Sequence, residues 1–421
     1  MDELAPQTEI QLAQHAAQTV VRTSYGKLIA ILAKRTRDVA QAEDLLAEAF
    51  ATALETWPCA GVPNNPEAWL ITVAQRKFLD SLRQVKVQVG SMRHLQLLKE
   101  ELEDMASQTH HLGDDRLALM FACAHPAIDP AIRSPLILQT VLGMTAEQIA
   151  SSYLIPAATM GQRLARAKAK IKLAGIPFQV PSADEFAGRF EAVLDAIYAM
   201  FDHAWSHYDA GGNGLAEDAL WFASLLIELQ PDQPEPLGLS ALILYLHARL
   251  RARRDAQGNF IPLADQDVNL WNSEMIDQAE HLLRRASAMN KIGRFQLEAA
   301  VQSVHTTRRF TGATDWKAIN KLYHVLYEIT GSAVVQLNLA YSIGEDEGWE
   351  MGLAALPELA AFPELASYQP YFAVRAALRE KCGQSVGALE DYERAIQIET
   401  DQTVINFLAG KCQRLRAVLL Q

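Results

Sequence analysis

The stretch from Ser134 to Lys172 has the composition and spacing of a surface that reads nucleic acid. Its last part is expected to form a helix that buries apolar side chains every three or four residues. The other face of that helix carries polar and basic side chains, namely Thr159, Gln162, Arg163, Arg166 and Lys170. No acidic residue occurs between Gln148 and Ala183, so this face has no local counter-charge. Arginine and glutamine hydrogen-bond base edges in the major groove, while further cations hold phosphates.

Three helices joined by two short turns are predicted to position this surface. Ser134 is expected to cap the first helix, with Pro135 at its first position and Gly143 at its end. Thr145 and Gln148 have the spacing of a capping box and open the second helix. A short helix, a tight turn and a cationic helix constitute a helix-turn-helix, whose last helix enters the major groove. A solvated surface helix of a bundle is the alternative interpretation.

The charge of the chain is divided unevenly. The 421 residues carry a formal net charge of −12. Residues 1–181 hold 18 Lys and Arg against 18 Asp and Glu, so the whole negative excess lies in residues 182–421. Only the first part therefore suits a polyanion such as DNA.

The cysteines and the apolar runs bear on the compartment. The four cysteines have no paired spacing, which favours a reducing compartment. The first residues lack the pattern of a signal peptide, and no apolar run is long enough to span a bilayer. We therefore expect a cytoplasmic protein that does not engage a membrane.

An acidic helix and an aromatic, basic helix are predicted before residue 90. Asp38 and Gln41 have a capping spacing ahead of an apolar stripe. The opposite face of this helix carries four carboxylates, those of Glu43, Asp44, Glu48 and Glu55. The next helix, Glu67–Arg83, interleaves Trp69 with cations, a composition that suits unstacked single-stranded bases. In the alternative interpretation, the acids are a solvated face and the tryptophan is part of a core.

The order of these elements resembles the extracytoplasmic-function sigma factors of bacterial RNA polymerase. The resemblance is carried by AEDLLAEAF (Ala42–Phe50), PEAWLITVAQRKFLDSLR (Pro66–Arg83) and the helix-turn-helix. The fuller pattern, with DDRLALMFACAHPAI (Asp114–Ile128) and AGIPFQVP (Ala174–Pro181), resembles the subgroup with a large helical C-terminal extension. The resemblance implies an all-α protein. It has a sigma region-2 domain at 9–90, a linker at 91–112, a helix-turn-helix sigma region-4 domain at 113–178 and a tetratricopeptide-like helical domain at 182–421.

The resemblance also implies roles for the residues that match its motifs. Six match the segment that docks on core RNA polymerase: Asp38, Ala42, Glu43, Asp44, Leu45 and Phe50. Five match the helix that captures the −10 element of promoter DNA: Trp69, Gln75, Arg76, Lys77 and Arg83. Thr159, Gln162, Arg163, Arg166 and Lys170 match the helix that reads the −35 element. The implied partners are core RNA polymerase, promoter DNA and a protein partner of the C-terminal domain.

Residues 182–421 are predicted to be helical, with breaks at glycine and proline clusters. The tail has the small and aromatic spacing of a tetratricopeptide unit, at Tyr371, Ala376, Leu378, Gly383, Ala388, Tyr392 and Ala395. Leu339, Ala340 and Ala354 lie about one period earlier. Such helix pairs stack into a solenoid whose concave face binds peptides or proteins. An irregular helical bundle is the alternative for residues 182–330.

The residue pattern predicts neither catalysis nor a cofactor. His203 and His207 stand one helical turn apart, but a zincin requires glutamate where Ala204 stands. The glycine-rich stretch 211–214 is not followed by the Lys-Ser/Thr of a phosphate loop. We therefore expect no enzyme, no cofactor and no bound metal.

Three functions remain open on the sequence. The first is an alternative sigma factor, the second a one-component helix-turn-helix transcription regulator with a helical sensor domain, and the third a tetratricopeptide scaffold. The segment Ala42–Arg83 favours the first over the second, because a plain regulator does not need an acidic docking helix followed by an aromatic, basic one. The division of charge further predicts that the acidic C-terminal part regulates the first part in cis.

Overall fold

The computed structural model describes residues 7–87, 115–153, 155–182, 185–186, 188–206 and 213–420. Within these residues the regular elements are α-helices and short 3-10 helices, with one isolated antiparallel bridge between Arg254 and Phe260. The predicted all-α fold class is confirmed. The predicted linker, 91–112, lies outside the described residues. The chain divides into two compact units, Met1–Met200 and Phe201–Gln421, and the division falls inside helix α9 (Phe190–Ser206).

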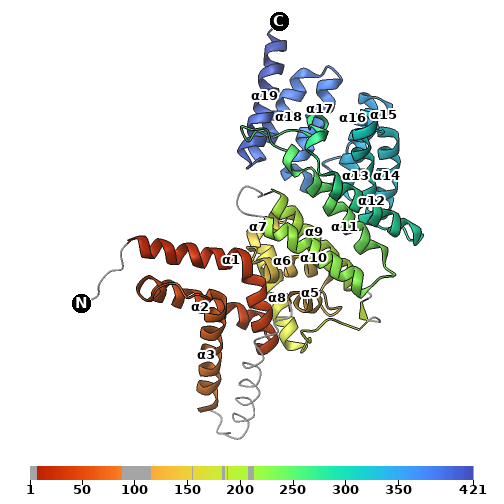
Figure 1. Cartoon of the computed structure of the whole chain (residues 1–421). Coiled ribbons are helices and arrows are strands. Elements are labelled where there is room, and N and C mark those ends of the chain that lie inside the picture. Colours follow the sequence, from red (N-terminus) through yellow and green to blue (C-terminus); the bar gives the residue numbers. More distant parts are fainter. Residues whose placement is uncertain are drawn as a thin grey trace. The chain divides into compact units, whose positions relative to one another are not determined.

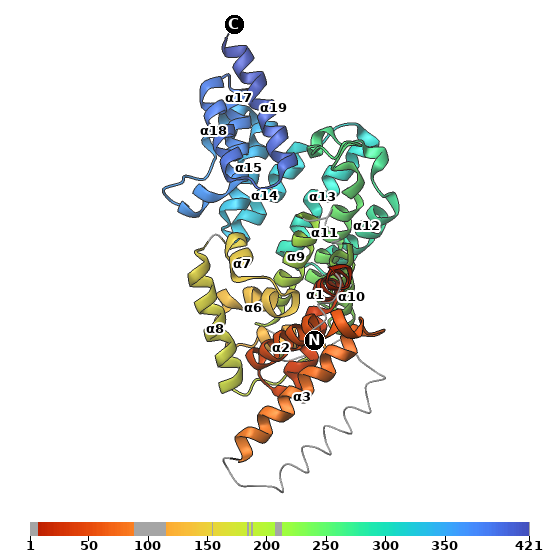
Figure 2. The same cartoon turned by 90° about the vertical axis from the view of Figure 1, so that its left-hand side faces the viewer.

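The first unit is organised around α1 (Gln7–Thr36). Figure 1 shows α2 (Val39–Ala60) and α3 (Pro66–Val87) extending to one side of it. The other helices of this unit are α5 (Arg116–Cys123), α6 (Pro130–Leu142), α7 (Ala146–Ser152) and α8 (Ala157–Leu173). Helix α1 packs on α2, α3, α5 and α6, and every residue from Leu28 to Ala33 near its end is buried. One helix thus holds the acidic helix and the predicted helix-turn-helix in the same unit, as Figure 2 shows from a second direction.

Several predicted helix caps are present. The Asp38 carboxylate accepts from the Gln41 backbone N–H at 3.3 Å, as its spacing predicts. The Asn65 side chain in addition caps α3, where it accepts from the Ala68 backbone N–H at 3.0 Å. The capping box is confirmed in both directions. The Thr145 N–H donates to Gln148 Oε1 at 2.8 Å, and the Gln148 N–H donates to Thr145 Oγ1 at 3.2 Å.

The predicted start of the helix before the capping box is wrong. Helix α6 begins at Pro130, one turn before Ser134, and Asp129 caps it by accepting from Ala131 at 3.0 Å. An acid followed by proline supplies both the side-chain acceptor and the fixed φ of a helix start. Ser134 is buried inside α6 and donates to the Ala192 carbonyl at 2.9 Å instead.

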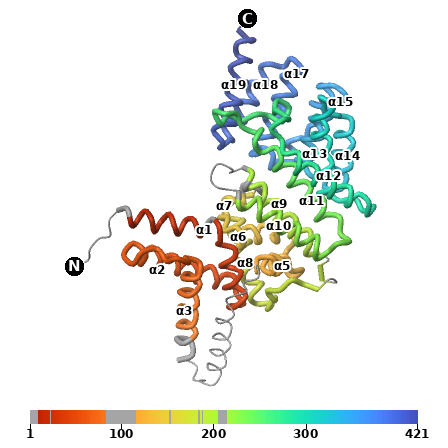
Figure 3. The backbone as a smooth tube through the Cα atoms, viewed as in Figure 1, coloured from red at the N-terminus to blue at the C-terminus, as the bar shows by residue number. Residues whose placement is uncertain are grey.

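The second unit is a succession of helices, each of which packs on its neighbours in sequence from α12 onward. Its α-helices after α9 are α10 (Asn213–Leu229), α11 (Pro234–Ala248), α12 (Ser273–Ala288), α13 (Arg294–Thr311), α14 (Trp316–Thr330), α15 (Ala333–Glu347), α16 (Trp349–Ala354), α17 (Gln369–Lys381), α18 (Ser385–Ile398) and α19 (Gln402–Leu419). Figure 3 traces this path. Helix α11 is buried along most of its length, so it forms the centre of the first part of this unit. Residues 211 and 212 of the predicted break at 211–214 lie outside the described residues, and α10 begins at Asn213.

The tail of the chain forms the helix pair that its spacing predicts. The predicted apolar positions of α17 and α18 are buried: Tyr371, Ala376, Leu378, Ala388, Tyr392 and Ala395. Between the two helices, Asp391 is 4% exposed and accepts from Arg375 at 2.5 Å and from Arg379 at 2.8 Å. Both the apolar contacts and this ion-pair cluster therefore hold the pair together.

Candidate functional site

Helix α8 presents three different faces. Its core face buries Met160, Leu164, Ala167 and Ile171, as the periodicity predicts. The predicted DNA-reading face lies elsewhere on the helix: Gln162, Arg163, Arg166 and Lys170 are exposed and Thr159 is half-buried. We call these five residues the reading face. Its guanidinium, ammonium and amide groups are accessible to a duplex, and their contact with DNA stays a prediction.

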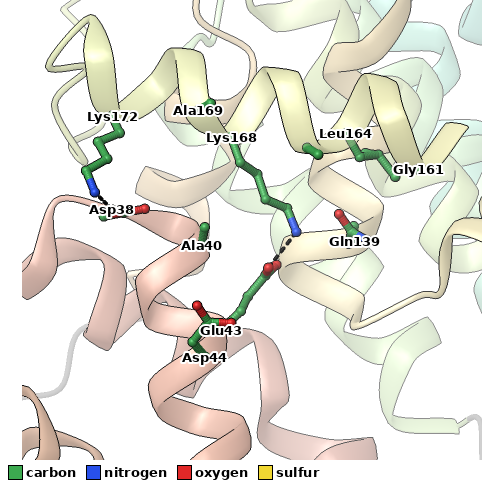
Figure 4. A pocket seen from close by; sticks show the side chains of 11 residues that line it. Asp38, Ala40, Glu43, Asp44, Gln139, Gly161, Leu164, Lys168, Ala169 and Lys172 are labelled. Carbon is green, nitrogen blue, oxygen red and sulfur yellow. Dashed lines mark hydrogen bonds and ion pairs between the residues drawn. The ribbon is translucent and has the colours of Figure 1, made fainter.

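The third face of α8 packs on the acidic helix α2. Figure 4 shows Lys168 pointing toward Glu43 and Lys172 toward Asp38. The Lys168 ammonium lies 2.5 Å from the Glu43 carboxylate, and the Lys172 ammonium lies 2.8 Å from Asp38. These side chains line a shallow pocket of about 400 Å³, which small residues of α8 complete, including Gly161 and Ala165. Two cations of α8 are therefore paired within the protein.

Burial sets the electrostatics of this contact. The side chains of Lys168 and Glu43 are 12% and 20% exposed, and that of Asp38 is 7% exposed. Burial raises the pKa of Glu43, although the attraction and hydrogen bond of Lys168 oppose the rise. Burial and the nearby Glu43 charge also raise the pKa of Tyr25 on α1. The carboxylate of Glu43 is thus stabilised mainly by one lysine.

The six predicted polymerase-docking residues fall into three environments. Ala42 and Leu45 are buried and pack α2 into the unit, while Phe50 is half-buried. Asp38 and Glu43 face α8, and Asp38 also caps α2. Asp44 is exposed. Sequence reasoning missed the pairing of the α2 acids with α8, because the partners are more than a hundred residues apart in the chain. One pattern in the sequence does indicate this pairing: Lys168 and Lys172 stand one helical turn apart beside small residues, which let another helix come close.

The predicted −10 residues lie along α3. Trp69 is half-buried and packs edge-on against Trp57 of α2, with ring centroids 5.5 Å apart. Arg76 is exposed, and the Lys77 ammonium lies 3.2 Å from Glu48. Gln75 is half-buried, and the side chain of Arg83 lies outside the described part of the structure. The tryptophan therefore has a packing role, and Arg76 is the more accessible cation.

Among the described residues no group of three or more His, Cys, Asp or Glu side chains is placed to hold a metal ion. His203 lies on α9, and His207 falls outside the described residues. In the same part of the chain, every helix is too short or too polar to cross a bilayer.

Comparison with known proteins gives three matches. The sigma-70 region 2 family matches residues 20–87, from within α1 to the end of α3. A family of unknown function, DUF6596, matches residues 189–287. An uncharacterized protein of Rhizobium meliloti (strain 1021) is 34% identical over 390 residues, which cover 90% of this chain and 91% of that relative. No solved structure matches the chain.

Proposed function

We propose that this chain, which belongs to the same family as the Rhizobium meliloti relative and carries a sigma-70 region 2 domain, is an extracytoplasmic-function type of alternative sigma factor. The region 2 match indicates a sigma factor with a role in transcription initiation. The finer proposal is that the protein binds core RNA polymerase in the cytoplasm and directs it to promoters with its own −35 and −10 elements.

The observation that supports this proposal is that one unit holds two helices, α3 and α8, whose accessible side chains suit two different forms of nucleic acid. Helix α3 combines Trp69 with the exposed Arg76, and α8 exposes the reading face. Opening a promoter requires unstacked bases to be held outside the duplex, at a cost of about a few kcal/mol per base. Cations and aromatic rings on α3 offset that cost, while α8 fixes the register on closed duplex DNA. A plain duplex-binding regulator needs only the second surface.

For the C-terminal part we propose a tetratricopeptide-like module that binds a protein partner or regulates the first unit in cis. The burial pattern of α17 and α18 and the sequential packing of the helices support the solenoid interpretation. The negative charge of residues 182–421 supports regulation through contact with a cationic surface. No catalytic role is proposed for either part.

The function is tested by mixing the purified protein with core RNA polymerase and following co-elution. A sigma factor forms a stable complex with the core enzyme, and its binding to promoter duplex depends strongly on that enzyme. If the protein binds duplex DNA specifically by itself and does not co-elute with the core enzyme, the one-component regulator is the better assignment. The exposed reading face is the observation that keeps this second candidate open.

Regulation in cis is tested with a chain that ends after Ser206 rather than after Pro181. The first unit extends beyond Pro181 to Met200, and its last residues pack on α5 and α6: the rings of Phe186 and Phe121 are 5.1 Å apart, and Arg133 donates to the Gly188 carbonyl at 2.5 Å. A chain that ends after Pro181 loses these contacts and would confuse regulation with instability. Equal core binding and transcription by the shortened and full chains would exclude regulation in cis.

A further inference from the structure

Within the first unit, α1 and α2 make a continuous contact surface with α5, α6 and α8. Two ion pairs join α2 to α8, and a third joins α1 to the start of α5, where the Lys34 ammonium lies 2.7 Å from Asp115. Tyr25 of α1 lies over Gly143, the left-handed residue that ends α6. Some of these contacts are ion pairs and others are close packing. Together they fix how α1 and α2 lie against α5, α6 and α8.

The closest approach lies at Gly26 in the middle of α1. A Cβ atom added at this position would lie 2.0 Å from the Val141 carbonyl oxygen of α6. No side chain fits there unless the two backbones move apart. Glycine in a helix interior costs about 1 kcal/mol relative to alanine. The close packing of α1 on α6, which the glycine permits, offsets that cost.

The ion pairs occupy part of the surface that the proposed function assigns to polymerase. Asp38 and Glu43 match the docking segment, and both carboxylates face α8 in this structure. The Lys168–Glu43 pair is mostly withdrawn from solvent, so salt screens it less than an exposed pair. The reading face of α8 points away from this contact and stays exposed.

We propose that α8 is an internal mask on α2, which core RNA polymerase must displace before it docks. The inference rests on the proposed function, because it requires α2 to be the docking surface. In the masked state Lys168 and Lys172 take the place of cationic groups of the polymerase, and Gly26 permits the close packing that holds α8 there. The mask covers the docking carboxylates of α2 and leaves the reading face of α8 exposed. Displacement releases both carboxylates for the new partner.

The test measures the dissociation constant of the full-length protein for core RNA polymerase by fluorescence anisotropy. Two variants weaken the mask by different means: Lys168→Gln with Lys172→Gln removes the ion pairs, and Gly26→Ala forces α1 away from α6. Both are expected to bind the core enzyme at least about fivefold more tightly than the original chain, because docking no longer competes with the internal contact. Circular dichroism verifies that each variant is folded.

The matched control is Arg166→Gln with Lys170→Gln, which removes two cations from the reading face of the same helix. It should bind the core enzyme as the original chain does. Unchanged or weaker core binding by the two mask variants would overturn the inference, and so would equal tightening in the control. If neither the original chain nor any variant binds the core enzyme, the proposed sigma function fails, a result distinct from failure of the mask alone.

Discussion

Trp69 and Arg76 lie on the same helix but in different surroundings, so substitutions can separate packing from strand capture. Arg76→Ala removes an exposed cation and should lower promoter opening by about fivefold to tenfold with little change in stability. Permanganate reactivity of unpaired thymines in the complex with polymerase measures the opening. Trp69→Ala should in addition lower the free energy of unfolding by about 2 kcal/mol, because the ring packs on Trp57. Full opening by the Arg76 variant would remove that residue from the strand-capturing surface.

Within the reading face, we expect some residues to discriminate between base sequences and others only to attract the DNA backbone. Gln162→Ala and Arg163→Ala should each cost about 1–3 kcal/mol of discrimination between the preferred −35 sequence and a changed one. Lys170→Ala should weaken binding to all duplexes alike. It should also lower by about one the number of ions released on binding, which is read from the slope of log affinity against log salt concentration. Competition binding with the two duplexes, in complexes with core polymerase, measures both quantities. The assignment of the reading face would be wrong if all three variants lost affinity uniformly.

His305 on α13 gives the second unit a predicted dependence on pH. Burial, with the nearby charges of Arg249 and Arg308, lowers the pKa of His305 to about 3. In the unfolded chain the pKa is about 6.5, so as pH falls below that value the unfolded state takes up a proton that the folded state does not. Stability is therefore lost between pH 6.5 and 3. From pH 7 to pH 5 the free energy of unfolding should fall by about 2 kcal/mol more than in His305→Gln. Urea titrations of both chains at the two pH values measure the difference, and equal falls would contradict it.

At the scale of the element, α17 and α18 depend on one buried carboxylate. Asp391→Asn keeps the size of the side chain but leaves two guanidinium groups without their counter-ion. The free energy of unfolding should fall by about 3 kcal/mol. The control is Glu393→Gln, whose carboxylate lies 2.6 Å from Arg416 in an exposed pair and should cost less than about 1 kcal/mol. Equal losses in urea titrations of the two variants would contradict the role given to burial.

Local patterns predicted the helices better than they predicted the contacts between them. The capping box at Thr145 and Gln148 and the buried stripe of α8 depend on neighbours within a few residues, and both are present. The sequence pattern predicts a start of α6 one turn too late, because two pairs, Asp129-Pro130 and Ser134-Pro135, offer a helix start and the choice between them depends on tertiary packing. The pairing of Lys168 with Glu43 was not predicted, because no periodicity relates residues 125 positions apart.

At the scale of the molecule, charge is divided unevenly along the chain. The negative excess lies in residues 182–421, while residues 1–181 are balanced overall and expose a cationic reading face. The negative charge of residues 182–421 repels DNA over a distance of about 10 Å at moderate salt. A chain that ends after Ser206 should therefore bind non-specific duplex more tightly than the full chain at low salt, and the difference should shrink as salt rises. Anisotropy titrations at several salt concentrations measure this effect, and a salt-independent difference would indicate a direct contact instead.

The central claim is that this chain gives core RNA polymerase a promoter choice that the core enzyme does not have alone. The most direct measurement is transcription of total bacterial DNA by core polymerase with and without the full-length protein, followed by sequencing of RNA 5′ ends. We predict a set of protein-dependent start sites that share sequence elements near −35 and −10. Transcripts from these sites should fall by about fivefold to tenfold with Arg76→Ala, and Arg163→Ala should weaken their dependence on the −35 sequence. The absence of protein-dependent start sites, with no complex between the protein and the core enzyme, would contradict it.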